Sequence, residues 1–313
     1  MNSSIIEVKH LVKCFGKHEV IKDISFDVRE QEILCLLGPN GAGKSTTIHI
    51  ITGILNKDGG DILYQGKSVV ECMEDFRRCI GFVPQDIALY EDLSAEQNIR
   101  FFASLYGLSS DKLEKQVAWG LEFAGLRNRC KDKVKTFSGG MKRRLNIACA
   151  IAHEPKLVIM DEPTVGIDPQ SRNHILQGIR ELQSKGMTIL YTTHYMEEVE
   201  EISDRIIIMD DGKIIAEGNQ EELKENLEDQ RQFMIEVEDS DGVCKEGFYH
   251  LEGVRDVVVK GNVICITTLK QTENLDRIIG EVLQQNLKIR NLNCQSMNLE
   301  TVFLRLTGRT LRD

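Results

Sequence analysis

Gly38-Pro39-Asn40-Gly41-Ala42-Gly43-Lys44-Ser45 matches the pattern G-x-x-x-x-G-K-[ST] at every fixed position. The apolar run before it, residues 32–37, predicts a buried strand, and residues 45–52 predict a helix after it. Glycines allow the backbone to curl until its N–H groups point inward, and the helix N-terminus adds positive charge. Lys44 then reaches the β- and γ-phosphates, and the Ser45 hydroxyl binds Mg²⁺. The stretch, continued by Thr46, predicts a nucleoside triphosphate site.

The alternative interpretation of this motif is a tight strand-to-helix turn that binds no ligand. The strand before it and the helix after it favour the nucleotide site instead. A second apolar run, Leu157-Val158-Ile159-Met160, ends in the carboxylates Asp161 and Glu162. Strands often end in acidic loops, so this pair is a weak signal alone. Together with the phosphate loop it predicts a hydrolysis site, with Asp161 on the metal and Glu162 on the attacking water.

Phe137-Ser138-Gly139-Gly140-Met141, followed by Lys142-Arg143-Arg144, is the most discriminating segment. A serine and two glycines ahead of a predicted helix, residues 141–152, form a second helix N-terminus suited to an anion. The alternative is a plain Ser138 N-cap with a flexible hinge. One nucleotide needs only one phosphate loop per chain, so a second such element predicts a dimer that closes over the nucleotide.

This segment resembles the LSGGQ signature of the ATP-binding cassette (ABC) ATPases, and the resemblance extends over about residues 5–218. It implies that the nucleotide is ATP and that Phe15 stacks on adenine. It also implies that Gln85 touches Mg²⁺ and water, that Asp168 lies at the dimer seam, and that His194 contacts the γ-phosphate. Ser138, Gly139, Gly140 and Met141 would then bind the γ-phosphate held by the other subunit. The catalytic residues by this reading are Glu162, His194 and Lys44.

The signature departs from the family pattern in two positions, because Phe137 and Met141 replace leucine and glutamine. Met141 lacks the amide group that glutamine would bring to the dimer seam. The sequence Ser-Gly-Gly-Met-Lys-Arg-Arg is similar to the signature of the branch of drug- and antibiotic-resistance exporters. A soluble ABC ATPase that acts on DNA or ribosomes is the alternative, but such relatives carry a long coiled-coil insertion or two cassettes in one chain, and neither is present.

Composition excludes other classes of protein. The sequence has 313 residues, with 39 Lys plus Arg against 49 Asp plus Glu and a formal net charge of -10. This acidity argues against nucleic acid as a partner. Nine scattered cysteines without a CxxC pair fit a reducing cytoplasm. No run approaches the ~18 apolar residues that span a bilayer, and the first 13 residues do not resemble a signal peptide. We therefore expect a cytoplasmic ATPase, a homodimer or paired with a second ATPase subunit, held peripherally at the membrane by a separate permease.

Alternating strands and helices predict an α/β fold with a mostly parallel sheet for residues 1–218, plus an antiparallel layer from residues 6–12 and 18–28. The family resemblance adds a helical subdomain around the signature. Glu197-Glu198-Val199-Glu200-Glu201 predicts a solvated helix face. The acidic residues 219–232 predict a linker or a boundary helix.

Residues 233–313 predict a small α+β accessory domain, ferredoxin-like in character, without catalytic residues. Residues 256–259 and 263–266 predict a hairpin. A helix follows, with an apolar stripe that includes Ile278 and Leu283, and then a strand over residues 287–292. Asn298 is expected to cap a last helix whose Phe303 and Leu306 point inward. Of the two helices, this last one is the better candidate for packing outside its own domain. We expect this domain to support dimerisation or assembly with the permease.

Overall fold

The computed structural model describes residues 3–225, 230–240, 242–296 and 299–307. These residues form two compact units, the first up to Asn219 and the second from Gln220 onward. The stretch predicted as a linker or a boundary helix, residues 219–232, contains parts of two regular elements. Helix α8 occupies Gln220–Glu225, and strand β11 already begins at Gln230. Helix α8 agrees with the boundary helix that the sequence offered as the alternative to a linker, whereas β11 takes the last three residues of the stretch.

A six-stranded sheet in the order β10-β9-β3-β8-β7-β6 forms the centre of the first unit, within the described residues. All neighbours pair parallel except β10, which runs antiparallel to β9. The central strands β3, β7 and β8 are buried along their whole length, as expected for strands covered on both faces. The strands are β3 Ile33–Leu37, β6 Ile80–Val83, β7 Leu157–Asp161, β8 Thr188–Thr193, β9 Arg205–Asp210 and β10 Lys213–Gly218.

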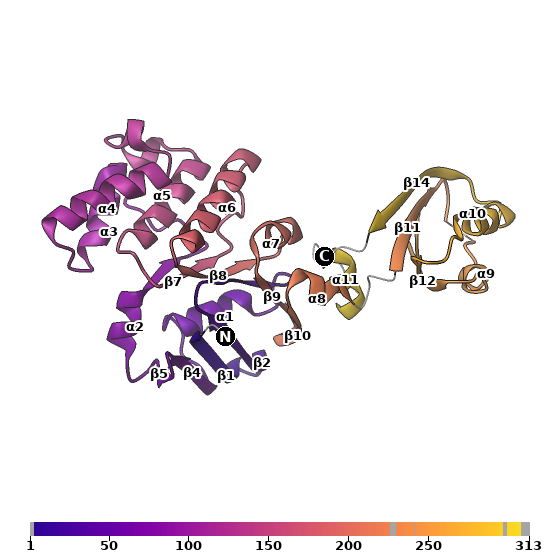
Figure 1. Cartoon of the computed structure of the whole chain (residues 1–313), viewed down its shortest axis with the longest axis horizontal. Coiled ribbons are helices and arrows are strands. Elements are labelled where there is room, and N and C mark those ends of the chain that lie inside the picture. Colours follow the sequence, from indigo (N-terminus) through magenta and orange to yellow (C-terminus); the bar gives the residue numbers. More distant parts are fainter. Residues whose placement is uncertain (1–2, 226–229, 241, 297–298, 308–313) are drawn as a thin grey trace. The chain divides into compact units, whose positions relative to one another are not determined.

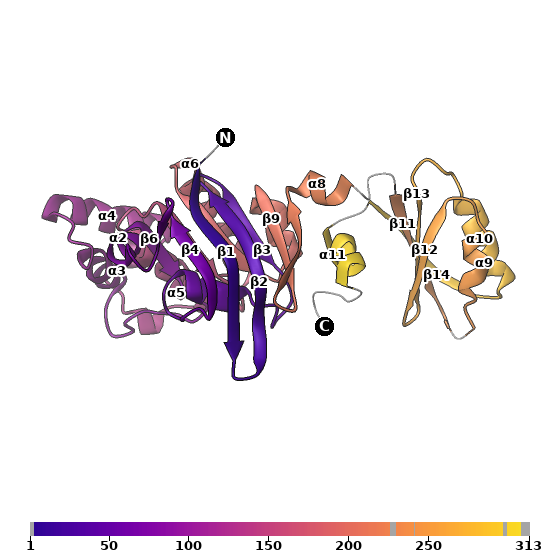
Figure 2. The same cartoon turned by 90° about the horizontal axis from the view of Figure 1, so that it is seen from below.

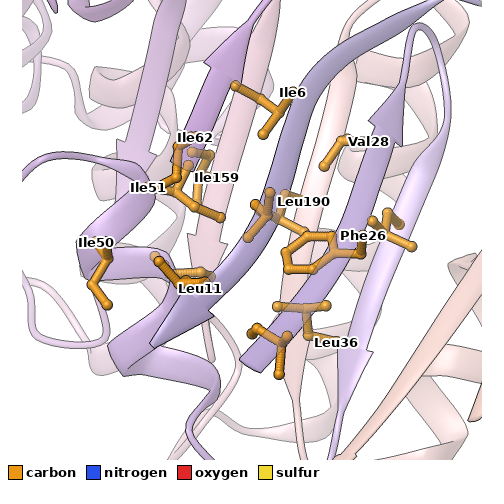
Figure 3. Packing of buried hydrophobic residues seen from close by; sticks show 14 of the residues in the cluster. Ile6, Leu11, Phe26, Val28, Leu36, Ile50, Ile51, Ile62, Ile159 and Leu190 are labelled. Carbon is orange, nitrogen blue, oxygen red and sulfur yellow. The ribbon is translucent and has the colours of Figure 1, made fainter. Parts of the chain in front are cut away.

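A second, antiparallel sheet in the order β2-β1-β4-β5 confirms the predicted β layer. Its strands are β1 Ser4–Phe15, β2 His18–Arg29, β4 Gly59–Tyr64 and β5 Lys67–Ser68. Buried residues of β1 and β2 such as Leu11 and Phe26 share one core with Leu36 and Leu190 of the parallel sheet and Ile51 of helix α1, Lys44–Ile51 (Figure 3). This core fixes the start of α1, and with it the phosphate loop, against both sheets.

Helices α3, α4 and α5 form a helical part with a core of its own, beside α6 (Figure 1). Ser94 caps α3 with a complete capping box with Gln97, and Ser138 caps α5, where it accepts a hydrogen bond from Met141 N (3.3 Å). The cap starts α5 at Gly139, two residues before the predicted start. The helices of this unit are α2 Met73–Cys79, α3 Ala95–Ser104, α4 Ser110–Phe123, α5 Gly139–Ile151, α6 Pro169–Ser184 and α7 Met196–Ile202, with the 3-10 turns η1 Arg127–Arg129 and η2 Val134–Thr136.

The second unit contains an antiparallel sheet in the order β12-β13-β11-β14. With α9 between β11 and β12, and α10 between β13 and β14, this is the ferredoxin-like arrangement that the sequence predicted. Figure 2 shows α9 and α10 on one face of this sheet. The elements are β11 Gln230–Val237, α9 Lys245–Tyr249, β12 Val254–Lys260, β13 Val263–Leu269, α10 Leu275–Gln284, β14 Ile289–Ser296 and α11 Leu299–Thr307.

Two predicted core positions of this unit are wrong. Leu283 is 58% exposed and Leu306 is 47% exposed, whereas Ile278 and Phe303 are fully buried. The apolar stripe on α10 is one residue wider than the face that the sheet covers. Strand β14 also begins two residues later than predicted, at Ile289. Asn298, the predicted cap of the last helix, lies outside the described residues.

Candidate nucleotide-binding site

The phosphate loop joins the carboxyl end of β3 to the start of α1, and two of its glycines are required by geometry. A Cβ on Gly38 would lie 2.3 Å from the Met209 carbonyl oxygen, so no larger residue fits there. Gly43 has a φ of 101°, in the left-handed region, and its Cβ would lie 2.7 Å from Ile21 Cδ1. The loop therefore packs directly on the two sheets, and its backbone conformation is fixed before any ligand binds.

Lys44 lies at the centre of the site, with its side chain almost fully buried. Its ammonium group donates to the carbonyl oxygens of Gly38 (2.8 Å) and Pro39 (3.1 Å) and lies 3.1 Å from Glu162 Oε1. Burial lowers the pKa of Lys44, and the negative charge of Glu162 opposes that shift. The two residues, 118 positions apart in sequence, form a buried ion pair in which each supplies the charge that the other needs.

The carboxylates at the end of β7 are held by hydroxyl groups. Asp161 Oδ1 accepts from Ser45 Oγ (2.9 Å) and from Thr192 Oγ1 (2.8 Å), and Thr192 Oγ1 accepts in turn from Glu162 N (3.0 Å). Glu162 Oε2 lies 3.2 Å from His194 Nδ1. The structure thus brings together four residues that the sequence predicted for metal binding and catalysis. Thr192 is an additional member of the site. The sequence motifs did not indicate it, because a single threonine in a largely apolar strand belongs to no motif.

A cavity of about 240 Å³ opens beside these groups. It is lined by Val20, Asn40, Gly41, Gly43, Lys44, Ser45, Thr46, Gln85 and Glu162. Predicted residues from three separate segments therefore share one cavity. Val20 is an addition, because nothing in its sequence surroundings distinguishes it from the other residues of its strand. Of the predicted loop residues, Pro39 and Ala42 contribute backbone, since Ala42 N donates to Pro39 O (3.2 Å).

Phe15 ends strand β1 with a ring that is 51% exposed, and the Lys13 ammonium lies 5.5 Å from the ring centroid. Phe15 does not line the cavity around Lys44. Its position at the end of β1 is open to solvent, which a stacking surface requires, so adenine stacking stays a prediction.

The signature residues lie elsewhere than the cavity. Ser138, Gly139, Gly140 and Met141 begin α5, and none of them lines the cavity around Lys44. Asp168 caps the neighbouring helix α6 by accepting from Ser171 N (2.9 Å), a bond that holds the pKa of Asp168 below its ordinary value. Within one chain the structure therefore separates the two predicted anion-binding elements.

Arg143 connects the signature helix to the loop that contains Gln85. Its guanidinium donates to the carbonyl oxygens of Pro84 (2.8 Å) and Gln85. The sequence placed Arg143 among basic residues that flank an anion site, but only 4% of it is exposed. It fixes the backbone on either side of Gln85, and no local sequence signal indicates these bonds, which span 59 and 58 residues.

A family model described as "ABC transporter" matches residues 21–165. The linearmycin resistance ATP-binding protein LnrL of Bacillus subtilis (strain 168) is 43% identical over 311 residues, which cover 99% of this chain and 100% of that protein. The chain belongs to the ABC transporter family. It is similar over 99% of its length to a Nod factor export ATP-binding protein I of Cupriavidus metallidurans, which is 36% identical and covered to 100%.

A solved structure has the same fold: a dimeric ATP-binding cassette in a post-hydrolysis state, bound to ADP and Pi. Its TM-score is 0.62 at 26% identity, and the match covers 68% of this chain and 98% of that one. The family and fold predictions are confirmed, and with them the resemblance to the antibiotic-resistance branch. This ABC protein is an ATP-binding transporter subunit and an ATPase. Among its described helices, none has the length and apolarity that a membrane span requires.

Proposed function

We propose that this ATPase powers the export of a small molecule, a drug, an antibiotic or a lipid-like compound, through a separate membrane permease. The names of two relatives support export: one is a linearmycin resistance protein and the other a Nod factor export protein. By this proposal the protein acts in the cytoplasm, held at the inner face of the cell membrane by the permease. The permease, not this chain, selects the exported compound.

The observation that carries the mechanism is the separation of the two anion-binding elements within one chain. Lys44 and Glu162 line the cavity, whereas Ser138 at the capped start of α5 does not. Two copies facing each other would let the signature of one contact the γ-phosphate held by the other. The dimeric relative bound to ADP and Pi supports this arrangement. We infer that ATP closes the dimer and that hydrolysis opens it.

In the proposed reaction each residue of the cavity has one task. Lys44 neutralises charge on the β- and γ-phosphates, and the N–H groups of the phosphate loop bind their oxygens. Glu162 orients and deprotonates the attacking water, and His194, 3.2 Å from it, contacts the γ-phosphate. Ser138 and Gly139 of the second subunit stabilise the same phosphate from the opposite side.

The oxygen atoms near the cavity fit a magnesium ion. Mg²⁺ takes oxygen ligands and binds through one or two protein groups together with substrate phosphates. Ser45 Oγ and Asp161 Oδ1 are only 2.9 Å apart, and the amide of Gln85 faces the same cavity. In the described part of the chain no three His, Cys, Asp or Glu residues form a metal site by themselves, which agrees with a metal that arrives with ATP. When bound, Mg²⁺ would neutralise charge on the phosphates.

The second unit would support assembly. It has a buried core of its own, and within its described residues we find no group of metal-binding side chains. We propose that this unit stabilises the dimer or its complex with the permease, and that the boundary lies between Asn219 and Gln220.

Glu162→Gln tests the mechanism, because it keeps the shape of the side chain but removes the proton acceptor. It should bind ATP, accumulate a dimer by sedimentation, and hydrolyse ATP about 10²–10⁴-fold more slowly. Export is tested by the protein that co-purifies from detergent-solubilised membranes. Recovery with a membrane permease supports the proposal, whereas sedimentation with ribosomes and no membrane partner contradicts it.

A further inference from the structure

Glu198 is a buried carboxylate that the mechanism above does not use. The acidic run around it predicted a solvated helix face, but Glu198 is 0% exposed. Three hydroxyl groups donate to it. Thr164 Oγ1 lies 2.6 Å from Oε1, and Tyr191 Oη and Thr193 Oγ1 each lie 2.8 Å from Oε2. Burial of a carboxylate is costly unless it is paired, and here three hydroxyl donors surround this one carboxylate.

The donors belong to the segments that carry the proposed catalytic pair. Thr164 follows Glu162 by two residues, and Thr193 directly precedes His194. Thr193 Oγ1 also accepts from Tyr195 N (2.9 Å), so the backbone is held on both sides of His194. Glu162 has a φ of 43°, a left-handed conformation that a non-glycine residue keeps only where its surroundings enforce it. The bond from Thr164 to Glu198 fixes the chain just beyond this strained residue.

Arg172 adds a third connection, from the helix that begins after Asp168. Its Nε lies 3.3 Å from Glu198 Oε1 and makes no hydrogen bond among the described residues, so this ion pair compensates it. The guanidinium lies 4.5 Å from the centroid of the Tyr195 ring, which is 4.2 Å from the ring of His194. Glu198 thus orders the side chain of Arg172, which packs on the neighbour of His194.

We propose that Glu198 is a positioning residue for ATP hydrolysis. It holds the backbone beside Glu162 and beside His194 so that the two side chains keep their 3.2 Å separation. The inference rests on the catalytic roles proposed above for these two residues. Glu198 does not line the cavity around Lys44, so it acts on the chemical step and not on ATP affinity.

The test is Glu198→Gln in the full chain. The substitution replaces one acceptor oxygen by an NH₂ group that faces hydroxyl donors, so at least one bond is lost. We expect kcat to fall about 10- to 100-fold, with KM for ATP changed less than about twofold. Glu201→Gln is the matched control, because it removes the same charge from an exposed position of the same helix. A wild-type kcat in Glu198→Gln, or a loss that appears in KM, overturns the proposal.

A double variant distinguishes a positioning role of Glu198 from a general loss of structure. If Glu198 acts through His194, the loss caused by Glu198→Gln should shrink to about two- or threefold in a His194→Ala background. If Glu198→Gln instead caused an unrelated structural defect, the losses in kcat from the two substitutions would multiply in the double variant, and that result would refute the proposal. Should Glu198→Gln fail to fold, a comparison of Thr164→Val with Thr164→Ser takes its place, since only the first removes the hydroxyl group that donates to Glu198. A Glu162→Gln variant with full activity would refute the proposed mechanism itself, independently of Glu198.

Discussion

Gly139 and Gly140 begin the same helix, yet an added methyl group should have opposite consequences at the two positions. A Cβ on Gly140 would lie 2.1 Å from Ser171 Oγ and 3.0 Å from Asp168 Oδ2. A Cβ on Gly139 would meet nothing within 4 Å. Gly140→Ala must therefore push the starts of α5 and α6 apart, whereas Gly139→Ala leaves the single chain unstrained.

The size of the difference follows from the surroundings of Ser171. This residue is 7% exposed, and its hydroxyl accepts from Arg144 Nη1 (2.9 Å), so it cannot turn away without loss of that bond. Overpacking costs about 1–3 kcal/mol, and alanine regains up to about 1 kcal/mol over glycine in a helix. We expect Gly140→Ala to lower the free energy of unfolding by about 1–3 kcal/mol once the hydroxyl bond is included. Gly139→Ala should leave it unchanged or raise it by up to about 1 kcal/mol.

Urea unfolding followed by tryptophan fluorescence measures this free energy for the first unit, which contains both glycines. The sequence contains one tryptophan, Trp119, and it lies in α4 of the first unit. The ATPase rate gives the second measurement. If phosphate from a second subunit docks in the open space at Gly139, the methyl group should lower the rate at least about tenfold, the equivalent of one hydrogen bond to a charged group.

Two results would refute this reasoning. Equal unfolding free energies for the two variants would mean that the starts of α5 and α6 are not packed as described. A Gly139→Ala protein that hydrolyses ATP at the full rate, independently of protein concentration, would mean that the signature does not meet phosphate across a dimer.

Three further predictions concern binding, pH and the second unit. Lys44→Ala should abolish high-affinity MgATP binding in a nucleotide titration, and unchanged affinity in a folded variant would contradict the assignment. Burial lowers the pKa of His153 from 6.5 to about 4, so the unfolded chain takes up the proton first as pH falls. His153 thus favours the folded state above about pH 6.5, and its contribution to the free energy of unfolding is lost as the pH falls towards 4. Urea unfolding across this pH range should show that the loss is absent in His153→Gln. A chain that ends at Asn219 should bind MgATP like the full chain but complement export poorly in cells; full complementation would show that the second unit is dispensable.

The phosphate loop could be predicted from sequence because its geometry is local. The glycines, the preceding strand and the following helix are contiguous, so Gly38 to Ser45 specify both the turn and the chemistry. The hairpin at residues 260–263 and the cap at Ser138 were predictable for the same reason. Each is decided by a few neighbouring residues.

The residues that hold the site in place could not be predicted in this way. Arg143 bonds to a carbonyl 59 residues earlier, and Thr164 reaches Glu198 across 34 positions. In sequence, Glu198 is one of four glutamates in a run of five residues, and only the tertiary packing distinguishes it from the exposed Glu197 and Glu201. Burial of a single charge is a long-range property, and one sequence without its relatives carries no mark of it.

In the proposed mechanism, the partners of Glu162 connect ATP binding with the chemical step. One of its carboxylate oxygens lies 3.1 Å from the Lys44 ammonium, and the other lies 3.2 Å from His194 Nδ1. A phosphate group that binds Lys44 therefore competes with Glu162 for the same positive charge. If Lys44 binds the phosphates as proposed above, phosphate takes the place of Glu162 in this ion pair, so the residue proposed to bind the substrate also releases the residue proposed to act on it.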